Sequence, residues 1–190
     1  KVFSDADAVL TTLRCGSNPS MVGELWPSGN LKTPDVHIEA LQELLNALKP
    51  SGVTELDISA IGIGPKGADH VADYVRDARA ALTKLAVGSN FLLGNRNAQS
   101  QEEYDAHGNI MPCEYEGFNM LCESLKTSPP IEVDLSDCRL DATATTTLAK
   151  AIELMAAIEK VNVSGCDVTQ EAAAQLFTAA NEASRARLRA

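Results

Sequence analysis

The sequence predicts an α/β repeat fold made of about five strand–helix units. Three observations indicate it: a pattern of spaced aliphatic residues occurs five times, neighbouring copies start as little as 28 or 29 residues apart, and a helical apolar pattern accompanies each copy. Repeats of this length are typical of proteins in which one supersecondary unit stacks on the next. Because a single unit cannot bury its own apolar side, stacked units share one continuous core.

Each predicted strand lies in a pattern with aliphatic residues at positions one, four, six and eleven and with Asn or Cys at position nine. Residues 82–92 and 158–168 fill every position, and residues 10–20, 53–63 and 130–140 each miss one. In the segment 82–92 the matching residues are Leu82, Leu85, Val87, Asn90 and Leu92. Along a strand, the residues at positions four and six point into the core, and the residue between them points outward.

A helix is predicted within each unit because apolar residues are spaced as one helical face. After the second, fourth and fifth strands this face lies at equal offsets: Val71, Ala72 and Val75, then Leu148, Ala149 and Ile152, then Leu176, Phe177 and Ala180. In the first and third units an insertion comes first, and the helical faces are Leu41, Leu44, Leu45 and Leu48, and Phe118, Leu121, Cys122 and Leu125. Prolines and the cap residue Thr169 set expected helix bounds of 35–48, 65–79 and 170–183.

These strands and helices resemble the leucine-rich repeats of ribonuclease-inhibitor-type proteins, over about residues 9–184. The resemblance implies a leucine-rich-repeat solenoid with a parallel concave sheet and convex helices, forming a single domain over residues 1–190 with insertions near 19–33 and 91–116. No capping unit is obvious at either end, which favours a fragment of a longer array, or an array whose ends partners cover.

The residue at position nine is expected to satisfy buried backbone groups at the turn after each strand. Asn18 and Asn90 do so through their amides, and Cys138 and Cys166 are small buried groups with a weak donor. Ile61 cannot make the hydrogen bond that Asn makes in the resembling family, so we expect a distorted turn there.

Composition excludes several function classes. The net charge of −10 disfavours nucleic-acid binding, and no run of 18 apolar residues exists that could insert into a membrane. The five cysteines form no paired zinc motif, which indicates reduced thiols in an intracellular, cytoplasmic protein. The sequence predicts no metal and no cofactor.

Two surfaces are candidates for contact with a protein partner. The first is the concave face of the sheet, with the candidate residues Arg14, Asp57, Lys84, Asp134 and Asn162. The alternative is a merely solvated sheet face, since this stripe is polar, mixed in charge and poor in the aromatic residues that dominate binding hot spots.

The second candidate surface consists of the two insertions, with the candidate residues Trp26, Tyr104, His107 and Tyr115. Both insertions are more apolar than solvent-exposed loops need to be. Either they pack internally, or they form a protruding partner-binding surface on a rigid framework, and each explanation can hold for different residues.

Catalysis has little support in the sequence. The histidines His37, His70 and His107 have no matched nucleophile nearby, and the glycines Gly62, Gly64 and Gly67 lack the Lys-Ser/Thr of a phosphate-binding loop. We therefore predict a non-catalytic protein–protein interaction scaffold, specifically a subunit of a larger assembly. The alternative, which the family resemblance implies, is a regulatory or sensor module: a GTPase activator, or the ligand-sensing repeat region of a nucleotide-binding receptor.

Overall fold

Five short strands form one parallel sheet in the computed structural model, which describes residues 10–94, 103–104, 110–155 and 157–187. The strands are β1 (Thr12–Arg14), β4 (Glu55–Asp57), β5 (Lys84–Ala86), β8 (Glu132–Asp134) and β9 (Lys160–Asn162), and they lie in that order across the sheet. The strands of consecutive repeat units are thus neighbours in the sheet, as the repeat pattern predicts.

The register of the sheet confirms the phase read from the sequence. Leu13, Leu56, Leu85, Val133 and Val161 are successive Cα partners across the five strands. Leu56 and Leu85 are almost completely buried, and so is Val133. The fourth position of each repeat therefore supplies one continuous row of core side chains.

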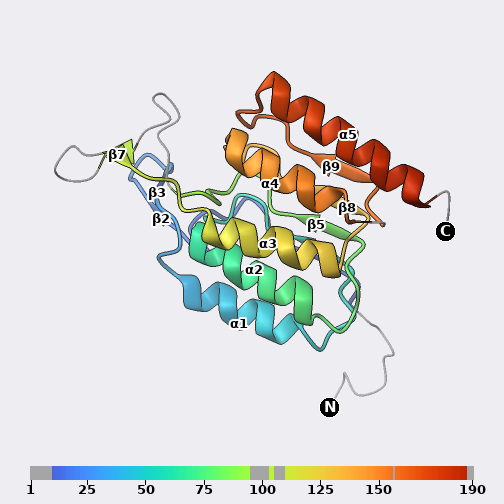
Figure 1. Cartoon of the computed structure of the whole chain (residues 1–190). Coiled ribbons are helices and arrows are strands. Elements are labelled where there is room, and N and C mark those ends of the chain that lie inside the picture. Colours follow the sequence, from blue (N-terminus) through green and yellow to red (C-terminus); the bar gives the residue numbers. More distant parts are fainter. Residues whose placement is uncertain (1–9, 95–102, 105–109, 156, 188–190) are drawn as a thin grey trace, which may run out of the picture.

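Within the described residues, five helices cover one side of this sheet. They are α1 (Ile38–Leu48), α2 (Pro65–Asp77), α3 (Glu116–Thr127), α4 (Ala142–Ile152) and α5 (Gln170–Arg187), and Figure 1 shows them stacked in chain order in front of the strands. The predicted faces of α2, α3 and α4 are buried, and each begins with a buried residue, Val71, Phe118 or Leu148. Gly117 allows α2 and α3 to pack closely, because a Cβ there would lie 1.9 Å from the carbonyl oxygen of Pro65.

The first helix begins at Ile38 and not at Asp35, which corrects the predicted bounds. Asp35 adopts a left-handed φ of 59°. Its carboxylate accepts hydrogen bonds from the backbone N–H groups of Gly64 (2.7 Å), Lys66 (2.9 Å) and Gly67 (3.2 Å), at the start of α2. No local pattern indicates this role, because Asp35 satisfies the N-terminal N–H donors of a different helix, about thirty residues further along the chain. Two C-terminal bounds also differ: α2 ends at Asp77 rather than at residue 79, and α5 continues to Arg187.

The glycines Gly64 and Gly67, after β4, leave space for the carboxylate of Asp35. A Cβ on Gly64 or Gly67 would lie 2.6 or 2.7 Å from a carboxylate oxygen of Asp35. Gly62 has a φ of +91°, and a Cβ there would lie 2.5 Å from the backbone nitrogen of Gly23. Internal packing therefore explains these glycines without a phosphate ligand.

Asn90 holds the turn that we expected to be distorted. Its Oδ1 accepts from the N–H groups of Ile61, Gly62 and Ile63 at 3.1–3.2 Å, and its Nδ2 donates to the carbonyls of Ile58 and Val87 at 2.9 Å each. The Asn of the third unit thus satisfies the turn of the second, where Ile61 is simply a buried core residue. That turn is fully hydrogen-bonded, and the expectation of distortion was wrong.

The two cysteines at position nine continue the same inter-unit contact. The thiol of Cys138 donates to the carbonyl of Val87, and the thiol of Cys166 to that of Leu135, both at 3.3 Å. Asn18 differs because it is exposed, and it donates only to the nearby carbonyls of Cys15 and Gly16. The expectation of a buried turn amide holds for Asn90 and fails for Asn18.

The predicted apolar face of α5 is only partly covered. Ala172 and Ala179 are buried, but Phe177 is 72% exposed and Ala180 is exposed as well. Of the predicted face only Leu176 is partly buried, and among the described residues no further strand and helix pack on the side of Phe177 and Ala180. Thr169 caps the helix as predicted, since its hydroxyl accepts from the N–H of Ala172 at 3.2 Å.

Candidate functional site

The sheet face that points away from the helices, predicted as the concave face, carries a row of alternating charges. Glu55, Lys84, Glu132 and Lys160 are successive Cα partners, so opposite charges lie side by side. Glu132 lies 3.6 Å from the ammonium of Lys84 and 3.8 Å from that of Lys160. These exposed ion pairs contribute little to the stability of the fold, but their opposite charges neutralise one another across the sheet face.

A second row on this open sheet face contains the other four candidates. Arg14, Asp57, Asp134 and Asn162 lie in register on β1, β4, β8 and β9. Asp57 accepts from the N–H of Ser59 at 3.0 Å, which ties its carboxylate to the turn of its own strand. Ala86, on β5 between the two aspartates, lies in the same row as predicted, and its small side chain is buried.

Like Asp57, Asp134 accepts a hydrogen bond from a backbone N–H two residues later, and its carboxylate makes one more contact. Its Oδ1 accepts from the N–H of Ser136 at 2.9 Å and from Nδ2 of Asn162 at 3.1 Å. The structure brings all five sheet candidates onto one face, but it also engages most of their polar groups internally. A shallow cavity of about 270 Å³ lies beside Arg14, Asp57 and Lys84.

The first insertion forms a hairpin of β2 (Glu24–Leu25) and β3 (Leu31–Thr33). At its base Val22 is completely buried and donates its N–H to the carbonyl of Ile61 at 3.0 Å. The insertion therefore packs on the core through one end and is not a free loop.

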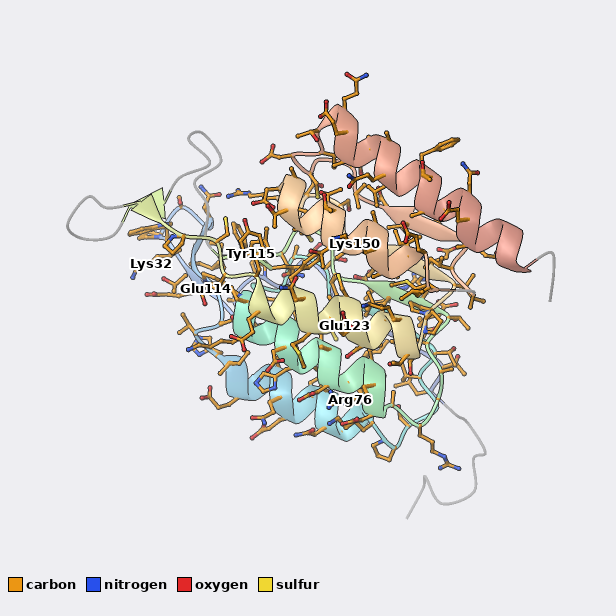
Figure 2. All side chains as sticks on the ribbon, in the orientation of Figure 1. Lys32, Arg76, Glu114, Tyr115, Glu123 and Lys150 are labelled. Carbon is orange, nitrogen blue, oxygen red and sulfur yellow. The ribbon has the colours of Figure 1, made fainter. Side chains whose placement is uncertain are left out.

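The side chain of Trp26 lies outside that packing. It is 53% exposed, and the ammonium of Lys32 lies 5.3 Å from the centre of its ring. Lys32 also forms an ion pair of 2.8 Å with Glu24, and Figure 2 shows Lys32 on the hairpin away from the helices. Lys32 and Glu24 were missed as site residues; the Gly29-Asn30 pair between them is a typical turn signal and could have indicated a hairpin there.

The second insertion includes a short antiparallel pair, β6 (Glu103–Tyr104) and β7 (Ile110–Met111). At its base Leu92 and Leu93 are buried, and the N–H of Glu114 donates to the carbonyl of Leu93 at 3.1 Å. The backbone of the candidate Tyr104 lies in β6, but its side chain lies outside the described residues, as does the whole of the candidate His107.

The candidate Tyr115 anchors the end of this insertion. Its hydroxyl donates a 2.6 Å hydrogen bond to Asp141, which also caps α4 by accepting from the N–H of Ala144. The hydrogen bond to this carboxylate, assisted by burial, raises the pKa of Tyr115 well above its usual value. Tyr115 is therefore held by internal contacts, whereas Trp26 is half exposed.

The two insertions leave the same edge of the sheet. Each follows the carboxyl end of a strand, β1 for the first and β5 for the second, and all five strands run parallel. Both are tied to the turn after β4, because Val22 bonds to Ile61 and the N–H of Phe91 donates to the carbonyl of Ile63. In Figure 1 the β2–β3 hairpin and β7 lie beyond the ends of α2 and α3.

A mixed-charge cleft of about 300 Å³ lies between the N-terminal ends of α2 and α3. Its lining includes Lys66, His70 and the carboxylates of Asp69, Glu114 and Glu116. In the described part of the chain, no group of three or more His, Cys, Asp or Glu side chains is arranged to hold a metal ion.

The thiols offer no activated nucleophile in four of five cases. All five cysteines are unbridged. Burial raises the pKa of Cys15 and Cys166, and it raises the pKa of Cys122 and Cys138 to about 12. A nucleophilic cysteine requires the opposite shift, because the thiolate is the reactive form.

The chain matches no protein-family model and no curated protein sequence. It is similar to a solved structure of a tropomodulin C-terminal domain, from structural genomics of Caenorhabditis elegans, with a TM-score of 0.57. The sequences are 20% identical, and the match covers 80% of each chain. At this identity the likeness shows the fold alone.

These findings correct the assignment to ribonuclease-inhibitor-type repeats. The fold is an α/β fold like that of the tropomodulin C-terminal domain, and no family model supports the narrower assignment. The 28–29-residue spacing suggested that family, but the insertions lengthen two of the four intervals between units. No helix among the described residues combines the length and apolar character that a membrane span requires.

Proposed function

We propose that this protein is a non-catalytic interaction module that binds a protein partner through the β2–β3 hairpin, with Trp26 as the anchor. The observation that carries the proposal is the half-exposed Trp26 ring, held in place by Lys32. Trp is among the residues most enriched at energetic hot spots of interfaces.

The hairpin is suited to binding because it is held before a partner arrives. Val22 fixes its base in the core, and Glu24 fixes Lys32 beside the ring. A side chain held in advance loses less conformational entropy on binding, so more of the contact energy contributes to affinity. The open sheet face is a second contact surface in this proposal, with its mixed charges providing specificity more than affinity.

Other features support the same proposal. The strand order β1-β4-β5-β8-β9, with one helix between successive strands, supports a solenoid whose edges and loops present contact surfaces. The five free thiols support residence in a reducing, intracellular compartment. The regulatory or sensor alternative depended on the corrected family resemblance and loses its support with that correction.

The test is native affinity purification of the tagged intact protein from its source cells. Trp26→Ala is compared with Leu154→Ala, a matched control because Leu154 is also a large exposed apolar residue, 66% exposed, at the end of α4. We expect a protein partner to be retained by the wild type and by Leu154→Ala and to be lost with Trp26→Ala, at an unchanged melting temperature. Recovery of no protein partner, or equal retention by both variants, would contradict the proposal.

A further inference from the structure

An apolar groove lies open between the last strand of the sheet and the last helix. It has a volume of about 370 Å³ and is lined mainly by Ile158, Val161, Val163, Leu176, Phe177 and Ala180. The ring of Phe177 forms part of its wall and is 72% exposed. In the described part of the chain this is the largest exposed fraction of any large apolar side chain.

The floor of the groove belongs to an edge strand. β9 pairs with β8 on one side and has no neighbour on the other within the described residues. The backbone groups on the free side of such a strand are a template for the addition of another strand.

The shape of the groove is set by the repeat of the fold. One unit earlier, the space between β8 and α4 is closed by β9, whose Val161 lies opposite Val133 and packs against the core together with Val163. The groove is the same space displaced by one unit. It therefore fits a strand that carries aliphatic side chains at two alternate positions.

The charge of Lys160 sets a second requirement for the strand that fits the groove. Along the open sheet face the row Glu55, Lys84, Glu132 and Lys160 alternates in sign and ends at Lys160. Lys160 faces Glu132 at 3.8 Å on one side, and its side chain is 65% exposed. A strand added in the same register places its own residue opposite Lys160, and an acidic residue continues the alternation.

We infer that the β9 edge binds an extended segment of a partner protein as a sixth parallel strand, with the pattern acidic–aliphatic–polar–aliphatic. β8 itself has this pattern, in the run Glu132-Val133-Asp134-Leu135. This site is separate from the Trp26 hairpin and does not depend on it.

A second copy of this chain fits the groove less well. Its free strand, β1, places the uncharged Thr12 where an acidic residue is required. The adjoining helix α1 exposes the polar side chains of Glu39, Gln42 and Glu43, which do not match the apolar wall at Phe177. A heterologous segment with the stated pattern is therefore the better occupant.

The test uses the intact protein and a fluorescent synthetic peptide that copies residues 130–137, with binding followed by fluorescence polarisation. We expect saturable binding that weakens by about tenfold with Phe177→Ala, the loss typical of removing one aromatic anchor. We expect a similar loss with Lys160→Glu, recovered when the peptide carries Lys in place of its single Glu, the copy of Glu132. Trp26→Ala leaves this binding unchanged, so the two proposals can fail separately.

Three outcomes would overturn the inference. The first is the absence of saturable binding, which includes the case in which another part of the chain already covers the groove. The second is equal binding of a peptide whose backbone N–H groups are methylated at alternate residues, since strand pairing requires them. The third is concentration-dependent self-association that Phe177→Ala abolishes, which would make a second copy the occupant.

Discussion

Replacement of Asn90 by Ala tests most directly the hydrogen bonds that join two stacked units of the fold. The Asn90 side chain is 1% exposed and makes five hydrogen bonds to backbone groups of two units. Removing the amide leaves three backbone N–H groups and two carbonyls without their partner. At about 1 kcal/mol for each hydrogen bond, the expected loss in the free energy of unfolding is about 5 kcal/mol. Small domains are stable by about 5–15 kcal/mol, so this one substitution removes a large share of the total.

Asn18→Ala is the matched control, because Asn18 occupies the same repeat position in an exposed setting. Its amide donates only to Cys15 and Gly16, where water can replace it, so the expected loss is below about 1 kcal/mol. The assay is urea unfolding followed by circular dichroism, with amide hydrogen exchange at Ile61 and Ile63 as a local readout. Equal costs for the two variants, or unchanged exchange at these amides, would refute the reasoning.

Three further predictions concern stability. Asp35→Ala removes the carboxylate that accepts at the start of α2, and we expect a loss of about 2 kcal/mol by urea unfolding, with Asp35→Asn losing less. Tyr115→Phe removes the 2.6 Å hydrogen bond to Asp141 and is expected to cost about 1–2 kcal/mol; an unchanged melting temperature would contradict the anchoring role. Burial raises the pKa of Cys122 and Cys138 to about 12 from a model-compound value of 9.0, so the unfolded thiols ionise first. The contribution of each buried thiol to the free energy of unfolding is then fully present below pH 9. It is lost as the pH rises from 9 toward 12, by about 1.4 kcal/mol per pH unit for each thiol. A urea midpoint that stays constant from about pH 8 to pH 10.5 would contradict this account.

The strands were predictable because their signal is local and periodic. A one-residue slip would move Leu85 from the core to the surface, so the phase of the aliphatic residues fixes the register across the sheet. The same reasoning placed Asn90 in a buried turn. It did not show that Asn90 serves the turn after the neighbouring strand, since that contact depends on how two units stack.

What the sequence did not predict depends on contacts between distant segments. Asp35 lies next to Pro34 and has the appearance of a helix start, but it serves the start of α2 instead. Phe177 has the phase of a core residue, yet burial also requires a neighbouring unit to cover it. At the candidate site, the sequence supplied Trp26 but not the Lys32 contact that fixes its ring. Residue types could be identified from the sequence, whereas their partners could not.

The proposed role of this protein depends on contact between a partner and the hairpin that carries Trp26. The most direct test replaces Trp26 with a photoreactive benzoylphenylalanine in the intact protein and irradiates the source cells. The same replacement at Ala47, an exposed residue of α1, is the control. We predict a covalent adduct with one protein partner from position 26 and none from position 47. The absence of an adduct at position 26, or the same adducts from both positions, would contradict the account.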